Sequence, residues 1–545
     1  MGEEVLFVRK ATGLVRGIGT WSVAAMCFTF TYLAAHFLPF FALVEYPGAN
    51  VPLTYLIAPL IWGWSMFCAM FLVAAFPRTS SDYVAISRVV SPYIGYISSV
   101  GLWMAIVPWI SGAAMYGSIL TGNAFSVLGM ARGSDRLISI GETLVGVDPV
   151  KLLAIVVIFV IIYAILGILG IQYTGPVITV AFGIYIVSMV LSVLGILYIA
   201  AGGVDRAMSM WNGSFGAGAW QEVETIAENS GWASYVSEAA GSTSNWGWPG
   251  GSVGSQTALA IVPAGFAVWG YEVANVAAGE IKTPKRTFAL GALISFVLMT
   301  VFMAIFNFAC FKAYGIWISK ASYVLYGFEL SASPQQLPAV LPSMQVFTGG
   351  PFAGTNSFLA LAMLIGPSFG WYVVPLVYII ILTRVQVAWA FDRVAPSFFA
   401  DVNDRYHTPH WGVIFVCAIS LFFAYSHVYA KYQTLVHTLP GAIFRYLFLS
   451  WAAMLLPLSR PEVFERSYTW KFLKVPLSTI VGLISAAMMT FMLYATIVAM
   501  AGDWIGIIFQ VVWFTIGSAI YITYWFYNKS KGIDVAALWR EIPPA

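Results

Sequence analysis

Charged residues are scarce in this chain, and that scarcity excludes most classes of soluble protein. Only 9% of the 545 residues are Asp, Glu, Lys or Arg, whereas 60% are hydrophobic and the mean hydropathy is +0.84. Soluble domains carry about 25% charged residues. The formal net charge of +3 is small and gives no sign of a nucleic-acid partner. We therefore expect a polytopic membrane protein surrounded by a lipid bilayer, with no nucleic-acid partner.

Motifs of common catalytic centres are also missing. The chain has four cysteines, and each lies within an apolar run, where packing is a more common role than disulfide formation or metal binding. No His/Cys cluster, phosphate-binding loop or nucleophile elbow is present. We expect neither enzyme activity nor a bound cofactor.

Long apolar runs, in contrast, are abundant. A run of about 20 apolar residues spans a bilayer as a helix. Twelve such runs can be recognised, and they predict an all-α polytopic membrane protein with about 12 transmembrane helices. They lie near residues 14–40, 52–76, 93–121, 150–171, 177–201, 255–278, 288–314, 358–383, 411–429, 434–458, 475–499 and 504–527.

The basic residues are divided unequally between the two sides of these spans. Of the 26 Lys and Arg residues, 18 fall on the side of the two termini, 7 fall on the other side, and Arg445 lies inside a span. The positive-inside rule then places both termini in the cytoplasm of a multi-pass cell-membrane protein. Three long connections, around residues 122–149, 202–254 and 315–357, fall on the outer side. The middle one includes a helix-like piece at 219–241, and we expect it to form an outer cap.

The stretch 255–287 begins as a membrane span and is then interrupted. Pro263 removes a helix amide, and Gly265 and Gly270 weaken the helix on either side of four apolar residues. Glu272 follows at a depth where an ionised carboxylate costs about 3 kcal/mol. Such a break is tolerated only where the freed backbone groups face protein, water or a ligand. A kinked helix with a satisfied Glu is the alternative interpretation.

Four segments resemble one family of membrane proteins. They are GYEVANVAAGEIKTPKR (270–286), FPRTSSDYVAISRVVSPYIGY (76–96), RVQVAWAFDRVAPSFFADVNDRYHTP (384–409) and SWAAMLLPLSRPEVFE (450–465). Together they resemble permeases of the amino acid–polyamine–organocation superfamily, most closely its archaeal and bacterial branches. Ser80 and Ser81 stand where the family has two glycines. In span 1 the family's Gly-Ser-Gly type motif is absent.

The resemblance implies the leucine-transporter fold, with a core at 1–458 and spans 11 and 12 with the C-terminal tail at 459–545. In that fold spans 1–5 and 6–10 are inverted repeats, and broken spans 1 and 6 face each other around the substrate. The implied function is secondary-active transport of amino acids or related small organic amines. The implied substrate-binding residues are Leu33, Ala34, Ala35 and His36 in span 1, and Phe266, Ala267, Val268, Trp269, Gly270 and Glu272 in span 6. The alternative is a subunit of the same fold without uptake activity, which anchors or senses within a complex with a membrane-protein partner.

The coupling ion is open between H⁺ and Na⁺. The family's span 5 Lys is absent, because its neighbourhood reads Tyr185-Ile186-Val187-Ser188. Glu272 or His36 could carry a proton, although His36 could equally be a hydrogen-bonded core residue. A sodium site would need hydroxyls and carbonyls from spans 1 and 8. The candidates are Thr29, Thr31 and Ser368, the last within GPSFG, which we expect to interrupt its helix.

Two further charged residues are candidates for gating. Arg445 lies deep in span 10 and needs a partner, either Glu272 or the carbonyls freed near Pro440 and Gly441. The pair would either lock helices together or form an outer gate. Glu280 and nearby basic residues face the loops at 78–88 and 384–405, and we expect them to form a cytoplasmic gate.

Overall fold

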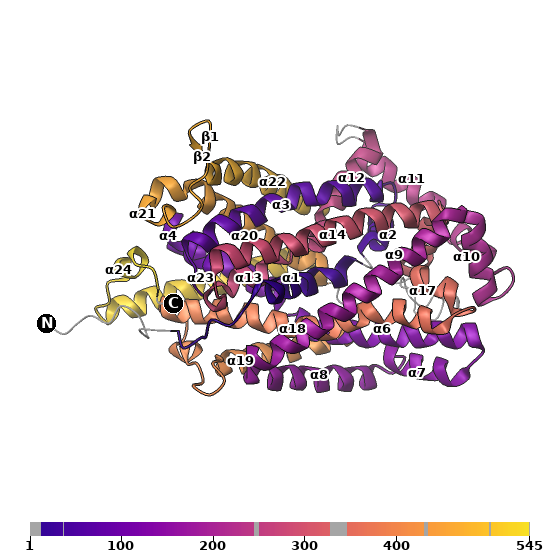
Figure 1. The fold of residues 1–545 in the computed structure, drawn as a ribbon, viewed down its shortest axis with the longest axis horizontal. Helices are drawn as coiled ribbons and strands as arrows, with labels where there is room; N and C mark the ends of the chain where they lie inside the picture. Colours follow the sequence, from indigo (N-terminus) through magenta and orange to yellow (C-terminus); the bar gives the residue numbers. More distant parts are fainter. Residues whose placement is uncertain are drawn as a thin grey trace.

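A computed structural model describes residues 12–35, 38–244, 250–327, 346–429, 434–500 and 503–543. In these residues the fold is helical apart from one two-stranded hairpin, and the long helices run mostly along the longest axis of the molecule (Figure 1). Ten helices in the described part are long and apolar enough to cross a membrane. They are α3 (Val51–Ala75), α5 (Pro92–Ile106) continued by α6 (Trp109–Arg132), α8 (Pro149–Leu169), α9 (Ile171–Phe215), α14 (Pro284–Tyr314), α18 (Ser357–Phe391), α19 (His410–Tyr429), α20 (Thr434–Ser459), α22 (Leu477–Ala499) and α23 (Trp504–Ser530).

The two predicted spans that are missing from these ten are the two predicted to be broken. Span 1 is described as α1 (Thr20–Ala35) and α2 (Leu38–Glu45), of 16 and 8 residues. Span 6 is α12 (Gly251–Ala264), the 3₁₀ turn η2 (Gly265–Ala267), α13 (Tyr271–Val276) and the 3₁₀ turn η3 (Ala278–Glu280). Each predicted span therefore has its counterpart, and the prediction of an all-α polytopic membrane protein is confirmed.

The boundaries and breaks predicted from the sequence are less accurate for spans 5 and 8. Helix α9 continues to Phe215 through a kink at Gly203, whose φ of +63° favours glycine. Helix α18 is continuous through Gly366–Gly370, so the interruption expected in GPSFG is wrong. The same helix extends to Phe391, past the end predicted at residue 383. The Arg384 side chain, which suggested that end, is buried against the Glu280 carboxylate.

The short elements gather at the two ends of the helix bundle (Figure 1). We call the end that holds the C-terminus the terminal face; it contains α4 (Ser81–Val89), α21 (Pro461–Phe464), β1 (Lys471–Phe472), β2 (Val475–Pro476) and α24 (Val535–Arg540). We call the opposite end the cap face; it contains α7 (Asp135–Val145), α10 (Ala219–Asn229), α11 (Trp232–Thr243), α15 (Trp317–Ser322), the π-helical turn η4 (Tyr323–Gly327) and α17 (Val346–Ala353). Helices α10 and α11 cover the helix-like piece predicted at 219–241.

The cap face has a core of stacked aromatic rings. The Trp220 and Trp317 rings stack with centroids 4.0 Å apart, and the Trp317 indole donates to the Trp220 carbonyl at 3.1 Å. The Tyr235 hydroxyl of α11 donates to the Val44 carbonyl at 2.7 Å. The described part of the connection, 202–244 and 250–254, is thus a folded cap attached to α2, the second half of span 1.

We predict that Trp317→Ala destabilises the cap. Truncation of a buried aromatic side chain costs about 3–5 kcal/mol, and Trp317 is buried against Trp220. The variant should unfold at lower temperature and be cleaved faster by protease within 202–254. Trp504→Ala is the control, because the Trp504 side chain is exposed on α23. Equal melting and cleavage in the two variants would contradict the prediction.

Candidate substrate site and terminal gate

The break in span 6 presses directly against α1. A Cβ atom added to Gly270 would lie 1.8 Å from the Cys27 carbonyl oxygen and 2.9 Å from Thr31 Cγ2. Only glycine allows two backbones to come this close. The Val268 amide donates to the Gly265 carbonyl at 3.0 Å, which closes the 3₁₀ turn just before the break. The predicted meeting of spans 1 and 6 is therefore present in the described residues.

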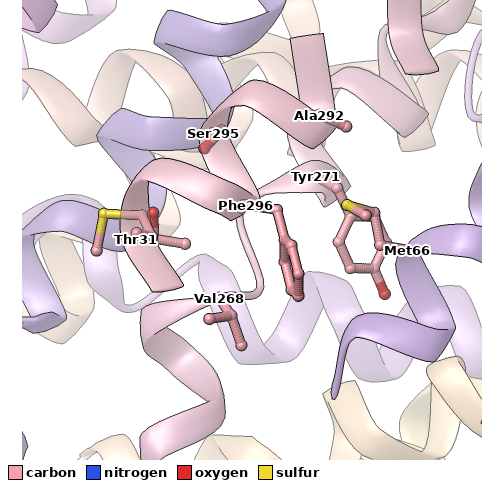
Figure 2. A pocket seen from close by; sticks show the side chains of 9 residues that line it. Thr31, Met66, Val268, Tyr271, Ala292, Ser295 and Phe296 are labelled. Atoms are coloured by element: carbon pink, nitrogen blue, oxygen red, sulfur yellow. The ribbon is translucent and has the colours of Figure 1, made fainter. Parts of the chain in front are cut away.

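A narrow hollow with about 180 Å³ of empty space lies beside this contact. Figure 2 shows the Phe296 ring in the middle, with Val268 and Thr31 to one side and Tyr271 and Met66 to the other. Two of the predicted substrate residues, Val268 and Gly270, line the hollow. The sequence missed its lining residues from α3 and α14, because nothing polar or broken marks those helix faces; they are Met66, Ala292, Ser295, Phe296 and Met299.

An aromatic cluster fills the space on the other side of the break. The Trp269 ring lies edge-on to Phe30 at 5.3 Å and to Tyr446 at 5.4 Å, and it packs against Phe266 at 5.1 Å. Phe30 in turn contacts Tyr378 of α18, with centroids 5.5 Å apart. Trp269 and Phe266 were predicted substrate residues, and in this structure their rings pack against each other at the break. Ala267, also predicted, is fully buried.

Glu272 belongs to a buried cluster of two carboxylates and one guanidinium. Its Oε1 lies 2.9 Å from Arg445 Nη2, and its Oε2 accepts a hydrogen bond from the Tyr446 hydroxyl at 2.9 Å. The same Arg445 Nη2 also contacts Oδ2 of Asp82 in α4. Asp82, Glu272 and Arg445 are each at most 1% exposed. The cluster joins α4, α13 and α20.

The partner expected for Arg445, Glu272, is present, and the choice between a pair that locks helices together and an outer gate stays a prediction. Asp82 belongs to α4 on the terminal face, so the guanidinium points toward that face and away from the cap. Asp82 Oδ1 accepts from the Tyr83 amide at 2.8 Å and from the Ser80 hydroxyl at 3.2 Å. The sequence missed Asp82 because an Asp in a polar connection is unremarkable until its partner is known.

Glu280 forms a buried ion pair at the terminal face. Its carboxylate receives two hydrogen bonds from Arg384 of α18, at 2.8 and 2.9 Å, and both side chains are buried. Its carbonyl accepts from the Gly17 and Ile18 amides at 2.9 and 3.0 Å, and the Ile18 carbonyl accepts from the Lys282 amide at 3.1 Å. The structure thus brings Glu280 to the predicted Arg384 region, and it also ties the chain before α1 to the end of span 6.

Arg88 and Asp392 form a further buried ion pair on the terminal face, in addition to Glu280 and Arg384. Arg88 Nη2 of α4 donates to Asp392 Oδ1 at 2.6 Å, just after α18, and the Tyr83 hydroxyl donates to Oδ2 at 2.7 Å. Burial lowers the pKa of the Arg88 guanidinium, but the adjacent Asp392 carboxylate raises it, and the net shift is upward. Arg88 also donates to the Glu541 carbonyl at 3.1 Å and lies 5.0 Å from the Trp539 ring centroid. The C-terminal segment is therefore part of the closed terminal face.

Residues 18–523 match the family model described as amino acid permease. The chain belongs to the amino acid permease family. The match places it in the amino acid–polyamine–organocation superfamily and identifies a multi-pass membrane transporter. No curated protein matches the chain.

The three candidate sodium ligands of the permease stay a prediction. Thr31 Oγ1 donates to carbonyls of its own helix, at 3.1 Å to Phe28 and 3.3 Å to Cys27. Within the described residues, the Thr29 and Ser368 hydroxyls are buried without a hydrogen-bond partner.

The substrate-site candidates of span 1 lie at the C-terminal end of α1. Leu33, Ala34 and Ala35 form its last turn, and α2 begins at Leu38. The side chains of Leu33, Ala34 and Ala35, and His36 as a whole, lie outside the described residues. Their assignment to the substrate site remains a prediction.

We predict that Arg384→Ala opens the terminal face of the permease. Removing one partner of a buried ion pair costs about 3–5 kcal/mol, because the other charge is left unpaired. Buried Cys27, next to Gly270, reports opening through its reaction with a polar maleimide in a variant whose other cysteines are Ser. Labelling of Cys27 should accelerate at least about tenfold, since 1.4 kcal/mol is a factor of ten.

Lys320→Ala is the control for this experiment. Lys320 pairs with Glu228 at 2.9 Å on the cap face, where the Glu228 side chain is 63% exposed. The Lys320 side chain itself is 13% exposed, but its contacts lie on the face opposite the Glu280–Arg384 pair, so Cys27 should react as in the parent. Unchanged labelling in Arg384→Ala would show that the Glu280–Arg384 pair does not hold the terminal face closed.

Proposed function

We propose that the permease is a secondary-active transporter that moves amino acids or related small organic amines by alternating access. The observation that carries this proposal is the break in span 6 at residues 268–270, packed on α1 with the buried Glu272 two residues further on. Half-helices that end at mid-membrane direct free peptide groups toward a solute. The adjoining hollow marks where spans 1, 2, 6 and 7 meet, and these spans would have to move apart to admit the solute.

We further propose that the terminal face is the cytoplasmic side of the cell membrane. The side of the termini carries 18 of the 26 Lys and Arg residues, which supports this orientation. The Glu280–Arg384 and Arg88–Asp392 pairs then close the cytoplasmic exit. Alternating access requires both pairs to separate while the cap closes over the opposite side.

We propose the proton as the coupling ion. Asp82, Glu272 and Arg445 together carry one excess negative charge when both acids are ionised, in a region without water contact. The neighbouring titratable side chains, Cys27, Tyr271 and Tyr446, are neutral in their ordinary state and do not offset it. When two carboxylates share one site, one of them favours its protonated form.

Glu272 is the better proton carrier of the two acids. Asp82 lies in the first turn of α4, where the helix dipole and the Tyr83 amide stabilise an anion. Glu272 shares Arg445 with Asp82 and has besides it one neutral hydrogen bond, from Tyr446, and no backbone amide among the described residues. Asp82 and Arg445 then form the ion pair, and Glu272 gains or loses the proton when the cluster meets water.

Transport by purified permease in liposomes tests the proposed function. We expect uptake of at least one labelled amino acid or amine from a panel, stimulated by a proton gradient and indifferent to sodium. Absence of uptake for every solute, together with a stable co-purifying protein, would favour the subunit that anchors or senses within a complex. Uptake that requires sodium would retain the transporter and reject proton coupling.

We predict that Glu272→Gln and Asp82→Asn each fold, whereas the double variant does not. In each single variant Arg445 keeps one carboxylate partner, and the net charge of the cluster is zero. The double variant leaves the buried guanidinium unpaired, which costs about 3–5 kcal/mol. Glu272→Gln should keep solute exchange. Its accumulation of solute under a proton gradient should be lower than in the parent by a factor of at least about ten, which corresponds to 1.4 kcal/mol.

Glu238→Gln is the matched control for the transport measurement, because Glu238 is exposed in α11. It should accumulate solute as the parent does. Gradient-driven accumulation by Glu272→Gln at the parental level would reject Glu272 as the proton carrier without affecting the proposal of transport.

A further inference from the structure

The connection between spans 10 and 11 forms a short β-hairpin. Strands β1 and β2 pair antiparallel, with Lys471 opposite Pro476 and Phe472 opposite Val475. The two turn residues, Leu473 and Lys474, both have positive φ, at 48° and 69°. Positive φ at both central positions is the type I′ geometry that matches the twist of a two-residue hairpin. The tip therefore has a defined shape.

This hairpin exposes large apolar side chains away from the helix bundle. The exposed fractions are 56% for Trp470, 61% for Phe472, 81% for Leu473 and 42% for Val475. Figure 1 shows β1 and β2 standing out beyond the bundle at the terminal face. The helix faces that also expose apolar residues lie along the spans, where acyl chains cover them. The hairpin lies outside the spans and needs a separate explanation.

Contacts at the hairpin base fix its depth relative to three spans. The Trp470 ring lies 6.4 Å from Phe71, one turn before the end of α3, and the Trp470 carbonyl accepts from the amide of Leu477, the first residue of α22. Lys285, the second residue of α14, donates to the Ser467 carbonyl at 2.8 Å. The base is thus level with the ends of spans 2, 7 and 11. The tip is three residues from Trp470, or about 10 Å of extended chain.

The charges beside the apolar tip identify its partner. Lys471 and Lys474 are exposed on either side of Phe472 and Leu473. Aromatic residues concentrate at the membrane interface, where an apolar ring meets the acyl chains, and nearby lysines attract anionic headgroups. An apolar tip flanked by two cations, within about 10 Å of the span ends, fits the headgroup layer of a bilayer.

We propose that the hairpin 470–476 is a lipid anchor that inserts Phe472 and Leu473 at the acyl boundary and binds anionic headgroups through Lys471 and Lys474. The partner is the leaflet on the terminal face. This proposal goes beyond solute transport and holds whether or not Glu272 carries a proton. Because Lys285 lies five residues after Glu280, the anchor also sets the position of the chain that follows the terminal gate.

A label at the tip tests the anchor. Leu473→Cys, carrying a polarity-sensitive fluorophore, is reconstituted in nanodiscs of phosphatidylcholine with or without phosphatidylglycerol; the four native cysteines are buried. Lipids brominated on their acyl chains should quench this label several-fold more than the same label at Asp404→Cys. Asp404 is the control because it is exposed on the same face, in the connection after α18. Phosphatidylglycerol should increase the quenching at 473.

A second variant separates the charge contribution from the apolar contribution. Lys471→Glu with Lys474→Glu, in the Leu473→Cys protein, should abolish the increase caused by phosphatidylglycerol and leave the melting temperature unchanged, because both lysines are exposed. Equal quenching at 473 and 404, with full access of aqueous iodide to both, would overturn the proposal. Protection of the 473 label that depends on a second copy in the disc, or on another bound protein, would overturn it as well.

Discussion

The sharing of Arg445 between Asp82 and Glu272 is the constraint on which the centre of this permease depends. Each charge is buried, and a buried charge without its partner costs several kcal/mol. The guanidinium therefore holds three elements together: α4 of the terminal face, α13 of the broken span and α20. When Asp82 and Arg445 form the ion pair, α4 and α20 cannot separate without orphaning a charge, whereas α13 is held by charge only while Glu272 is ionised. Movement of the terminal face must then be accompanied by water, a proton or a solute that compensates this cluster.

The segment from Gly270 to Lys282 connects the centre to the gate over a short distance. Gly270 lies against the α1 backbone, Glu272 belongs to the charged cluster, and Glu280 binds both Arg384 and the chain before α1. Only α13 and η3 separate these contacts. A shift at the break is therefore passed to the gate through about three short helical turns, with no long element to absorb it. This proximity gives a movement at the break a direct physical route to the Glu280–Arg384 pair.

Local features could be predicted from the sequence, and features made by tertiary contact could not. Apolar runs reveal spans because the bilayer requires them, and Pro263 with Gly270 reveals the break in span 6 because both act on their own backbone. The Glu272–Arg445 pair was also predictable, since two buried opposite charges need each other. Asp82 and Phe296 were not, because a polar connection and an unbroken helix face contain no sign of what packs against them. The continuity of α18 through Pro367 shows that its packed neighbours outweigh a local helix-breaking tendency.

The centre of this structure is tightly packed. The hollow beside the break has no room for even a water-sized molecule, and the Trp269, Phe30 and Tyr378 rings pack together next to it. The terminal face is closed by ion pairs, and on the cap face Tyr235 holds the end of α2. A solute can therefore enter the centre only if its aromatic rings move, and α2 is held on the cap face by the Phe40–Phe347 ring contact as well as by Tyr235.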